Sequence, residues 1–347
     1  MKTIRVNASS SYDVVIERGI LKDCGKLIAD VTKSRKTVII TDDIVEALYC
    51  DTVERSLAEN GFSFSRFVFP NGEASKNSET LNEIYDFLAK NEITRKDIII
   101  ALGGGVTGDM AGYAAATYLR GVEFVQIPTT LLAQIDSSVG GKTAIDIPAG
   151  KNLVGAFKQP ALVICDSDTL KTLTPEILAD GMAEAIKYGM IKDKSLFEKI
   201  AERNLDTIEE IMDELVYSCI DIKRQVVEAD EFESGERMTL NFGHTLGHAV
   251  EGFYNYSTYT HGSGVAVGMC YITDKFCDKD VYNKLADCVK AYRLPIDVPA
   301  KMSELLPFCA KDKKRDSDSI SYIVCREIGK AEICRATVDE FFGIMGE

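Results

Sequence analysis

The three histidines of this 347-residue chain fall in one short window, as His244, His248 and His261. His244 and His248 are four residues apart in the segment NFGHTLGH, a spacing that would put both rings on one face of a helix. Histidine ligates metals and changes its charge near neutral pH. Three histidines in one window, with none elsewhere, therefore favour metal binding or acid–base chemistry over three ordinary core residues.

A catalytic zinc takes three protein ligands and leaves a fourth position for substrate. Glu184 is a candidate for the remaining ligand, because it is the acidic residue of AEAIKYG, a segment that we expect to be helical. Spacing alone nominates His244 and His248 as the ligand pair, whereas His261 precedes a glycine-rich stretch, HGSG.

Glu233, Arg237 and Asn241 recur every four residues just before the histidine window. On a helix they would share a face, either as an exposed surface with ion pairs or as side chains that point into the same cleft. Gly235 argues against a regular helix there.

A glycine cluster, GGGVTGD at residues 103–109, follows the apolar run DIIIAL. We expect a strand to enter the cluster and a helix to leave it, so that N–H groups at the helix start can attract phosphate. The spacing differs from the common GxGxxG, and a tight strand–helix turn is the alternative. Asp109 either complements the helix dipole or holds a ribose or nicotinamide group.

The segment NGEASK at residues 71–76 is a weaker signal. It is either a turn with a helix cap, or a site where Glu73 accepts from a ribose hydroxyl and Lys76 meets a polar cofactor group.

Residues 128–158 crowd polar side chains and glycines into a stretch with little apolar material for a core. Lys142 and Lys151 each follow a glycine, and lysine and asparagine donors beside exposed backbone suit phosphate or carboxylate groups. A purely structural loop of this length is uncommon, so the segment favours an anion site. Its polar and glycine residues are Thr129, Thr130, Asp136, Ser137, Ser138, Gly140, Gly141, Lys142, Lys151 and Asn152.

Alternating strands and helices must position the first half of these residues. Strand patterns occupy residues 37–41, 64–69, 97–102, 123–127 and 161–165, and helical patterns occupy residues 44–59 and 78–90. This alternation predicts an α/β domain with a parallel sheet covered by helices. Helical patterns dominate beyond residue 174, over 177–187, 196–204, 208–228 and 245–253. We therefore predict two domains, at residues 1–172 and 173–347.

Composition limits the possible functions. The net charge of −14 argues against nucleic acid as a partner, and an anionic substrate would need positive charge concentrated in one pocket. No apolar run is long enough for a membrane span, and the N-terminus lacks the apolar core of a signal peptide. Ten cysteines without a CxxC pair favour free thiols in a reducing cytoplasm. The charge run DKKR at residues 312–315 has a solvated turn as its ordinary interpretation.

Taken together, these motifs resemble the 3-dehydroquinate synthase family over nearly the whole chain. The matching segments are NGEASK, GGGVTGD, RGVEFVQIPTTLLAQIDSSVGGKTA, GKNLVGAF, GMAEAIKYG, LNFGHTLGHAVE and HGSGVAVGM. GGGVTGD alone would admit several dehydrogenases, but the PTTLLAQIDSSVGGKTA run and its combination with AEAIKYG and the histidine motifs are far more specific.

The resemblance implies a Rossmann-like N-terminal domain, an all-helical C-terminal domain and an active site between them. It implies zinc or cobalt on Glu184, His244 and His261, and it makes His248 a substrate-site group. It also implies NAD at the glycine cluster. The residues that would touch NAD are Asp42, Asn71, Gly72, Glu73, Lys76, Gly104, Gly105, Val106, Thr107, Gly108, Asp109, Thr129, Thr130, Lys142, Lys151, Thr169, Leu170, Lys171 and Thr172.

The same resemblance assigns substrate and catalytic residues. Substrate contacts would come from Lys142, Asn152, Arg237, Asn241, His248, a lysine of the DKK segment such as Lys313, and Arg120, which would reach across a homodimer interface. Catalytic groups would be Asp136, Lys142, Lys187, Lys223, Glu233 and His248.

The implied reaction belongs to the shikimate pathway of aromatic amino acid biosynthesis. It converts 3-deoxy-D-arabino-heptulosonate 7-phosphate to 3-dehydroquinate and phosphate. The steps are transient oxidation by NAD, phosphate elimination, reduction, ring opening and intramolecular aldol closure. Two departures from the usual family motifs concern fine specificity: Asp146 stands where asparagine is expected, and HGSG replaces HGEA.

Three alternatives remain open. Another sugar-phosphate cyclase, such as an amino-dehydroquinate or valiolone-forming synthase, would share the cofactor and metal motifs and differ in substrate positions. A metal-dependent alcohol or polyol dehydrogenase would release NADH stoichiometrically. A catalytically dead binding or scaffolding protein is disfavoured by the intact set of charged groups, since such groups cost stability when buried without purpose.

Overall fold

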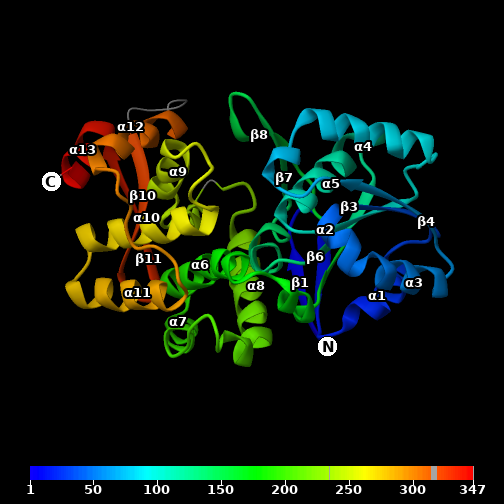
Figure 1. Ribbon diagram of the computed structural model, residues 1–347, viewed down its shortest axis with the longest axis horizontal. Coiled ribbons are helices and arrows are strands. Elements are labelled where there is room, and N and C mark those ends of the chain that lie inside the picture. Colours follow the sequence, from blue (N-terminus) through cyan, green and yellow to red (C-terminus); the bar gives the residue numbers. More distant parts are fainter. Residues whose placement is uncertain (234, 314–318, 347) are drawn as a thin grey trace. The chain divides into compact units, whose positions relative to one another are not determined.

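The computed structural model describes residues 1–233, 235–313 and 319–346, with the side chains of residues 310–313 left out. The chain forms two compact units. The first contains Met1–Leu173 and Lys223–Glu228, and the second contains Thr174–Ile222 and Ala229–Glu347. Figure 1 colours both units along the sequence.

A seven-stranded sheet organises the first unit (Figure 1). In spatial order its strands are β1 (Lys2–Asn7), β2 (Ser11–Ile16), β9 (Leu162–Cys165), β6 (Glu123–Pro128), β5 (Ile98–Gly103), β3 (Lys36–Asp42) and β4 (Ser63–Phe69). Strand β1 pairs antiparallel with β2, and all other neighbours are parallel. The central strand β5 is buried along its whole length, as expected of a strand covered on both faces.

Alternate residues of β5 face two separate cores. Ile98 and Ile100 pack in the core formed with α1 (Cys24–Val31) and α3 (Asp51–Glu59). Ile99 packs in the core formed with α4 (Ser78–Lys90) and α5 (Gly105–Thr117). Helices therefore cover both sheet faces, which is the arrangement that the alternating sequence pattern predicted.

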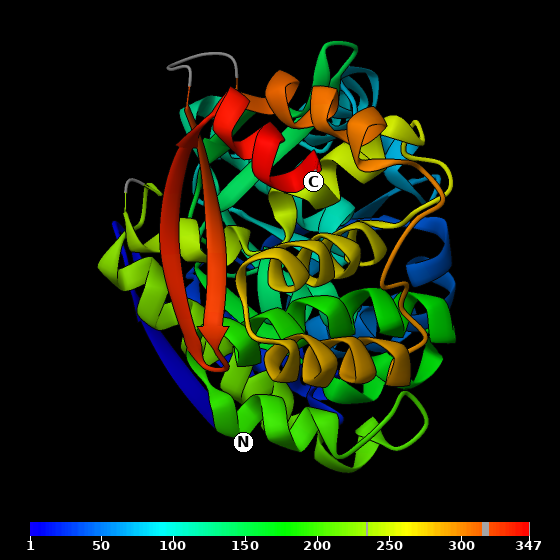
Figure 2. The same ribbon diagram turned by 90° about the vertical axis from the view of Figure 1, so that its left-hand side faces the viewer.

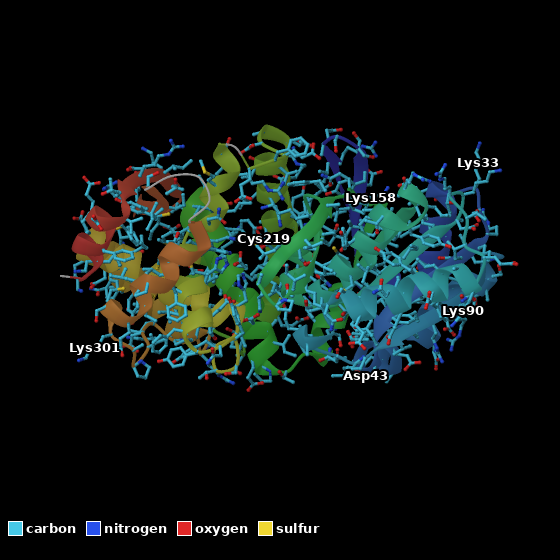
Figure 3. All side chains as sticks on the ribbon, turned by 90° about the horizontal axis from the view of Figure 1, so that it is seen from above. Lys33, Asp43, Lys90, Lys158, Cys219 and Lys301 are labelled. Carbon is cyan, nitrogen blue, oxygen red and sulfur yellow. The ribbon has the colours of Figure 1, made fainter. Side chains whose placement is uncertain are left out.

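Short elements complete the first unit. They are η1 (Ile20–Asp23), α2 (Asp43–Val45), η2 (Glu46–Cys50), η3 (Glu73–Ser75), η4 (Tyr118–Arg120), η5 (Ala133–Ser137) and η6 (Ser167–Thr172). Strands β7 (Lys142–Ile147) and β8 (Gly150–Phe157) form a separate antiparallel hairpin. Lys33, after α1, and Lys90, at the end of α4, are exposed and extend outward from the unit (Figure 3).

Helices form most of the second unit. They are α6 (Pro175–Lys192), α7 (Lys194–Ala201), η7 (Ile208–Ile211), α8 (Met212–Ala229), η8 (Glu236–Asn241), α9 (His244–Phe253), α10 (His261–Phe276), α11 (Lys279–Ala291), α12 (Met302–Lys313) and α13 (Val338–Gly346). Helix α8 begins in the second unit, and its residues Lys223–Glu228 belong to the first. None of the helices in the described part of the chain combines the length and apolarity that crossing a bilayer demands.

The second unit also contains a β-hairpin, so the expectation of an all-helical C-terminal domain is wrong. Strands β10 (Ser319–Glu327) and β11 (Lys330–Thr337) pair antiparallel, and Figure 2 shows them as a long ribbon beside the helices. The run SYIVC is rich in the β-branched and aromatic residues that favour strands. Gly329, with φ 90°, supplies the left-handed turn between the strands.

Candidate functional site

The candidate metal centre takes one side chain from each of three neighbouring helices of the second unit: Glu184 of α6, His244 of α9 and His261 of α10. Glu184 Oε1 lies 3.6 Å from His244 Nε2 and 3.7 Å from His261 Nε2. A tetrahedral ion bound at about 2.0 Å would separate its ligand atoms by about 3.3 Å. The three groups therefore fit a divalent metal with little movement.

Contacts behind the two rings orient the histidines. His244 Nδ1 lies 3.2 Å from the backbone oxygen of Phe242, and His261 Nδ1 lies 2.9 Å from Glu251 Oε1. With a proton on each Nδ1, both contacts are hydrogen bonds, and both Nε2 lone pairs face Glu184. A metal ligand needs this tautomer.

The two oxygens of the buried Glu184 carboxylate have different surroundings. Oε2 accepts from the ammonium of Lys187, which is also buried and lies three residues further along α6. Oε1 is buried and has no hydrogen-bond partner. Leaving a buried polar atom unpaired costs about 1–3 kcal/mol. A bound cation is the partner that fits this oxygen.

The two histidines differ in their affinity for protons. Burial and then the Lys187 ammonium lower the pKa of His244 well below its ordinary value. Burial alone would also lower the pKa of His261, but the neighbouring carboxylates of Glu184 and Glu251 outweigh it and raise this pKa to about 10. A metal would therefore bind one neutral ring and one ring that must first release its proton.

Glycines at the crossing of α9 and α10 let the two helices approach closely. A Cβ on Gly247 would lie 2.9 Å from the backbone carbon of Gly264, and a Cβ on Gly268 would lie 1.9 Å from the backbone oxygen of Gly243. Each segment thus brings two glycines, four residues apart, to the contact. As a result, the histidine that begins α9 and the histidine that begins α10 have ring centroids only 5.2 Å apart.

His248 lies beside the same rings, with its centroid 5.4 Å from that of His244 and 6.0 Å from that of His261. His248, Glu251 and His261 form a second group with metal-ligand geometry among the described residues. The two groups share His261. The buried oxygen of Glu184 that has no partner favours the first group.

In the first unit, the glycine cluster joins β5 to α5. Gly104 is the extended N-cap residue of α5 and offers no side-chain cap. A Cβ on Gly103 would lie 2.4 Å from Thr107 Oγ1, and a Cβ on Gly108 would lie 2.8 Å from Gln126 Oε1. Close packing therefore favours glycine at both positions, most strongly at Gly103, and the predicted tight strand–helix turn is present.

Two buried hydroxyls beside this turn have no hydrogen-bond partner: Thr129 Oγ1 and Ser137 Oγ. The N–H of Thr129 donates to the oxygen of Gly103 at 3.0 Å, and Ser137 Oγ lies 3.3 Å from where a Cβ on Gly105 would be. Phosphate oxygens accept several hydrogen bonds and are stabilised at a helix start. The loop therefore fits a phosphate-bearing cofactor as well as a structural turn.

Comparisons with known proteins identify the family of the chain. Residues 66–180 match the family described as 3-dehydroquinate synthase N-terminal, and residues 181–315 match 3-dehydroquinate synthase C-terminal. The 3-dehydroquinate synthase of Clostridium acetobutylicum is 46% identical over 339 residues, which cover 95% of each chain. The chain belongs to the 3-dehydroquinate synthase family. The predicted family and enzyme class are thereby confirmed.

Two solved structures resemble this 3-dehydroquinate synthase family member in fold. A 2-deoxy-scyllo-inosose synthase complexed with carbaglucose-6-phosphate, NAD+ and Co2+ has a TM-score of 0.87, 22% identity and coverage of 99% of both chains. The 2-epi-5-epi-valiolone synthase of Streptomyces hygroscopicus, with NAD+ and Zn2+ bound, has a TM-score of 0.88, 24% identity and coverage of 99% of this chain and 98% of its own. These likenesses confirm the predicted Rossmann-like fold class.

In this family member, Lys76 connects the predicted cofactor residues to the β7–β8 hairpin. Its ammonium lies 2.6 Å from Asp109 Oδ2 and 2.6 Å from Asn152 Oδ1. Asp146 completes a ring of contacts, since its N–H donates to the Lys76 oxygen at 2.8 Å and its Oδ1 accepts from the Asn152 N–H at 2.8 Å. The structure thus brings together two predicted NAD contacts and one predicted substrate contact.

Other predicted cofactor residues also have partners within the first unit. Asp42 caps α2 by accepting from Ile44 and Val45, and its Oδ2 lies 3.5 Å from Thr107 Oγ1. Lys151 Nζ lies 3.4 Å from Glu73 Oε1. Asn71 donates its N–H to Asp43, and Thr130 Oγ1 accepts from the N–H of Ala133. Of the remaining two, Gly72 has a left-handed backbone with φ 110°, and Val106 is half-buried in α5.

The segment Thr169–Thr172 lies in η6 and is held by Tyr49. The Tyr49 hydroxyl is 3.0 Å from the backbone oxygen of Thr169 and 2.5 Å from Thr172 Oγ1. Within the segment, Thr169 and Leu170 are buried, whereas Lys171 is exposed and pairs with Asp168 at 2.6 Å. Exposed Lys171 and Thr172 are the members of this segment with side chains accessible to a ligand.

Among the predicted catalytic residues, Asp136 and Lys223 are in contact. Asp136 lies in η5, and the Lys223 ammonium, from the part of α8 in the first unit, contacts its carboxylate and its backbone oxygen. Lys142 begins β7 and is exposed. Arg120 ends η4 in an exposed turn with φ 65°.

The proposed helical face of Glu233, Arg237 and Asn241 is not formed. Glu233 lies in a turn with φ 60°, and only the later residues form the 3₁₀ helix η8. The turn nevertheless brings Asn241 Nδ2 within 2.7 Å of Glu233 Oε1. The buried Arg237 donates to the backbone oxygen of Glu231. Lys313 ends α12, and its side chain lies outside the described residues.

Sequence reasoning missed Glu251 and Asp180, two buried or partly buried carboxylates near the metal centre. Glu251 contacts His261, and Asp180 Oδ1 accepts from the N–H of Gly262 at 2.6 Å. Both follow simple helical spacing, since Glu251 lies three residues after His248 and Asp180 lies four before Glu184. That spacing was the available signal.

Proposed function

We propose that this protein converts 3-deoxy-D-arabino-heptulosonate 7-phosphate to 3-dehydroquinate and phosphate, with NAD and one divalent metal, zinc or cobalt. The observation that carries the proposal is the buried Glu184 Oε1, which has no hydrogen-bond partner and faces two histidine nitrogens in a member of this family. The glycine turn with its two unpaired hydroxyls supports the NAD assignment.

We assign the metal to Glu184, His244 and His261, and NAD to the first domain, residues 1–172. When bound, the metal would act as a Lewis acid toward substrate hydroxyls. Lys187 would hold the second oxygen of Glu184 and leave the first oxygen for coordination. The second domain, residues 173–347, would then carry the metal and part of the substrate site.

NAD would contact the residues named for it above, from Asp42 to Thr172. The N–H groups at the start of α5 and the hydroxyls of Thr129 and Ser137 would bind the cofactor phosphates. The pair of Lys76 and Asp109 would lie beside them and present one charge of each sign.

The substrate residues would act mainly through charge. Lys142, Asn152, Arg237, Asn241, His248, Lys313 and the partner-reaching Arg120 are proposed to bind the phosphate and carboxylate groups. Asp136 with Lys223, and Glu233 with Asn241, form hydrogen-bonded pairs suited to moving or holding protons at substrate hydroxyls. Such a set would concentrate positive charge in a protein whose net charge is −14.

The reaction requires no net oxidation. Hydride leaves the C5 alcohol for NAD, and the new ketone acidifies the neighbouring C–H. The substrate's own phosphate can take that proton as it is eliminated. Hydride then returns from NADH, the ring opens, and an intramolecular aldol addition closes the carbocycle.

We further propose a homodimer in the cytoplasm. Arg120 supports the dimer, because its guanidinium is exposed in a turn where a partner subunit could meet it. The cytoplasmic location is supported by the ten cysteines, all of which are free thiols.

The deciding experiment incubates metal-loaded protein with the heptulosonate phosphate and trace NAD+. Phosphate and dehydroquinate should appear in equal amounts, far exceed the NAD+ supplied, and disappear when the metal is chelated. Accumulation of NADH would instead indicate a dehydrogenase. Turnover only of other sugar phosphates would indicate a related cyclase, and a catalytically dead protein would turn over none of them.

A further inference from the structure

Glu251 has the contacts of a residue that positions a metal ligand. It lies in α9, and its side chain is only 5% exposed although it carries a carboxylate. Its Oε1 lies 2.9 Å from His261 Nδ1. The opposite nitrogen of the same ring, Nε2, faces Glu184 Oε1 at 3.7 Å. His261 therefore lies between two buried carboxylates, one at each ring nitrogen.

The packing of α9 on α10 leaves space for this carboxylate. A Cβ on Gly264 would lie 3.3 Å from Glu251 Cγ and 3.4 Å from its Oε1. These distances are tighter than ordinary van der Waals contact, so a larger residue at position 264 would press on the Glu251 side chain. Glycine at this position lets the carboxylate reach the ring of His261.

An imidazole binds a metal through one nitrogen only when the proton is on the other. A carboxylate that accepts from Nδ1–H fixes this tautomer, fixes the plane of the ring and makes Nε2 a stronger donor. The Glu251 contact has the geometry that this effect requires. A second contact holds the helix start, since Asp180 of α6 accepts from the N–H of Gly262.

We infer that Glu251 is a positioning residue that holds His261 in the tautomer and orientation needed for metal binding, and thereby sets the metal affinity of the Glu184–His244–His261 group. The inference rests on the proposed metal site. It assigns Glu251 a role different from that of a ligand, although Glu251 also belongs to the second group, with His248 and His261.

The contacts favour positioning over direct ligation. The Glu251 oxygen nearest His261 is already engaged with Nδ1. An ion bound by the second group would also leave Glu184 Oε1 buried without a partner. An ion bound by the first group would remove that unpaired oxygen and keep the Glu251 hydrogen bond.

Zinc affinity of the full-length protein tests the inference, measured by competition with a chelator. We expect Glu251→Ala to raise the zinc Kd roughly 10- to 100-fold. Glu251→Gln keeps an acceptor for Nδ1–H and should recover a substantial part of this loss. The matched control is Asp180→Asn, which removes a neighbouring carboxylate charge without removing a ring contact and should leave the Kd unchanged.

The Co2+ d–d spectrum distinguishes positioning by Glu251 from direct ligation by Glu251. Wild type and Glu251→Gln should share band positions, because the atoms that bind the ion are the same. An unchanged Kd in Glu251→Ala, or an equal loss in Asp180→Asn, would overturn the inference. So would loss of the ion in His248→Ala with retention in Glu184→Gln, which would make Glu251 a ligand.

Two controls keep these outcomes separate. Circular dichroism identifies a variant that fails to fold. If Glu251→Ala does not fold, the zinc Kd and the Co2+ spectrum of Glu251→Gln decide by themselves between positioning and direct ligation. Wild type that binds no stoichiometric zinc, with His244→Ala indistinguishable from it, would contradict the proposed metal site itself. A wild type that binds zinc normally, with Glu251 variants that bind equally well, would contradict only the positioning role.

Discussion

The ammonium of Lys76 lies 2.6 Å from the carboxylate of Asp109, and Lys76 is only 5% exposed. Burial alone would lower the pKa of Lys76, but the carboxylates of Asp109 and Glu73 outweigh it and raise this pKa. Lys76 is therefore charged at neutral pH, whereas burial raises the pKa of Asp109 against the opposing effect of the Lys76 ammonium. The pair connects the helix that leaves the glycine cluster to the turn after β4, so this contact contributes to the stability of the first unit and lies in the proposed NAD site.

Replacing Lys76 with methionine should destabilise the first unit by about 3–5 kcal/mol, because it leaves the Asp109 carboxylate without its cation. Chemical unfolding followed by circular dichroism measures this, since the chain has no tryptophan. The double variant Lys76→Met/Asp109→Asn should recover part of the loss. Equal stability of the Lys76→Met and double variants would show that the Asp109 carboxylate costs nothing when it loses its cation.

Lys142→Ala should weaken substrate binding and turnover while the fold stays intact, because Lys142 is exposed at the start of β7. Removing one hydrogen-bonding cation from a phosphate site costs about 1.5–3 kcal/mol, or roughly 10- to 100-fold in kcat/KM. Steady-state kinetics and a thermal melt measure both properties. An unchanged kcat/KM would remove Lys142 from the proposed site.

The glycine crossing predicts a steric effect on the metal centre. Gly268→Ala would place a Cβ 1.9 Å from the backbone oxygen of Gly243, so α9 and α10 must separate. We expect a loss of about 1–3 kcal/mol in stability together with weaker zinc binding. The control is Gly343→Ala in α13, where a Cβ meets nothing within 4 Å and should be neutral or slightly stabilising. Equal melting temperatures for the two variants would contradict the packing argument.

Much of the candidate metal centre was predictable from the sequence, because few types of side chain bind metals. Three histidines in a chain with no others pointed to one place, and an acidic residue in an alanine-rich helix pointed to Glu184. Spacing could not choose between the His244–His248 pair and the group with His261. That choice depends on how closely α9 approaches α10, which is set by tertiary contacts between glycines.

Other features depended on contacts between distant segments. Helix α8 has one continuous helical pattern, yet its residues Lys223–Glu228 belong to the first unit, where Lys223 contacts Asp136. The β10–β11 hairpin was overlooked because the surrounding helical patterns dominated, although SYIVC and Gly329 carried the signal. Local patterns located five strands of the sheet, β3, β4, β5, β6 and β9, but the sequence analysis missed β1 and β2 at its edge.

Metal-free protein should lose stability as pH rises, because of His261. Burial alone would lower the pKa of His261, but Glu184 and Glu251 raise it to about 10 in the folded chain. The unfolded value is about 6.5. Because the folded pKa is the higher one, protonated His261 stabilises the fold fully below about pH 6.5. This contribution is lost as pH rises through the folded pKa.

Melting temperatures of chelator-treated protein between pH 6.5 and 10.5 test this linkage. The wild-type curve should fall more steeply than that of His261→Gln, which lacks the titrating ring. Zinc binding at pH 8 should also release about one proton from this site, because the metal replaces the proton on His261. Calorimetry in two buffers of different ionisation enthalpy counts that proton. Parallel melting curves, with no proton released, would show that the two carboxylates do not hold a charged ring.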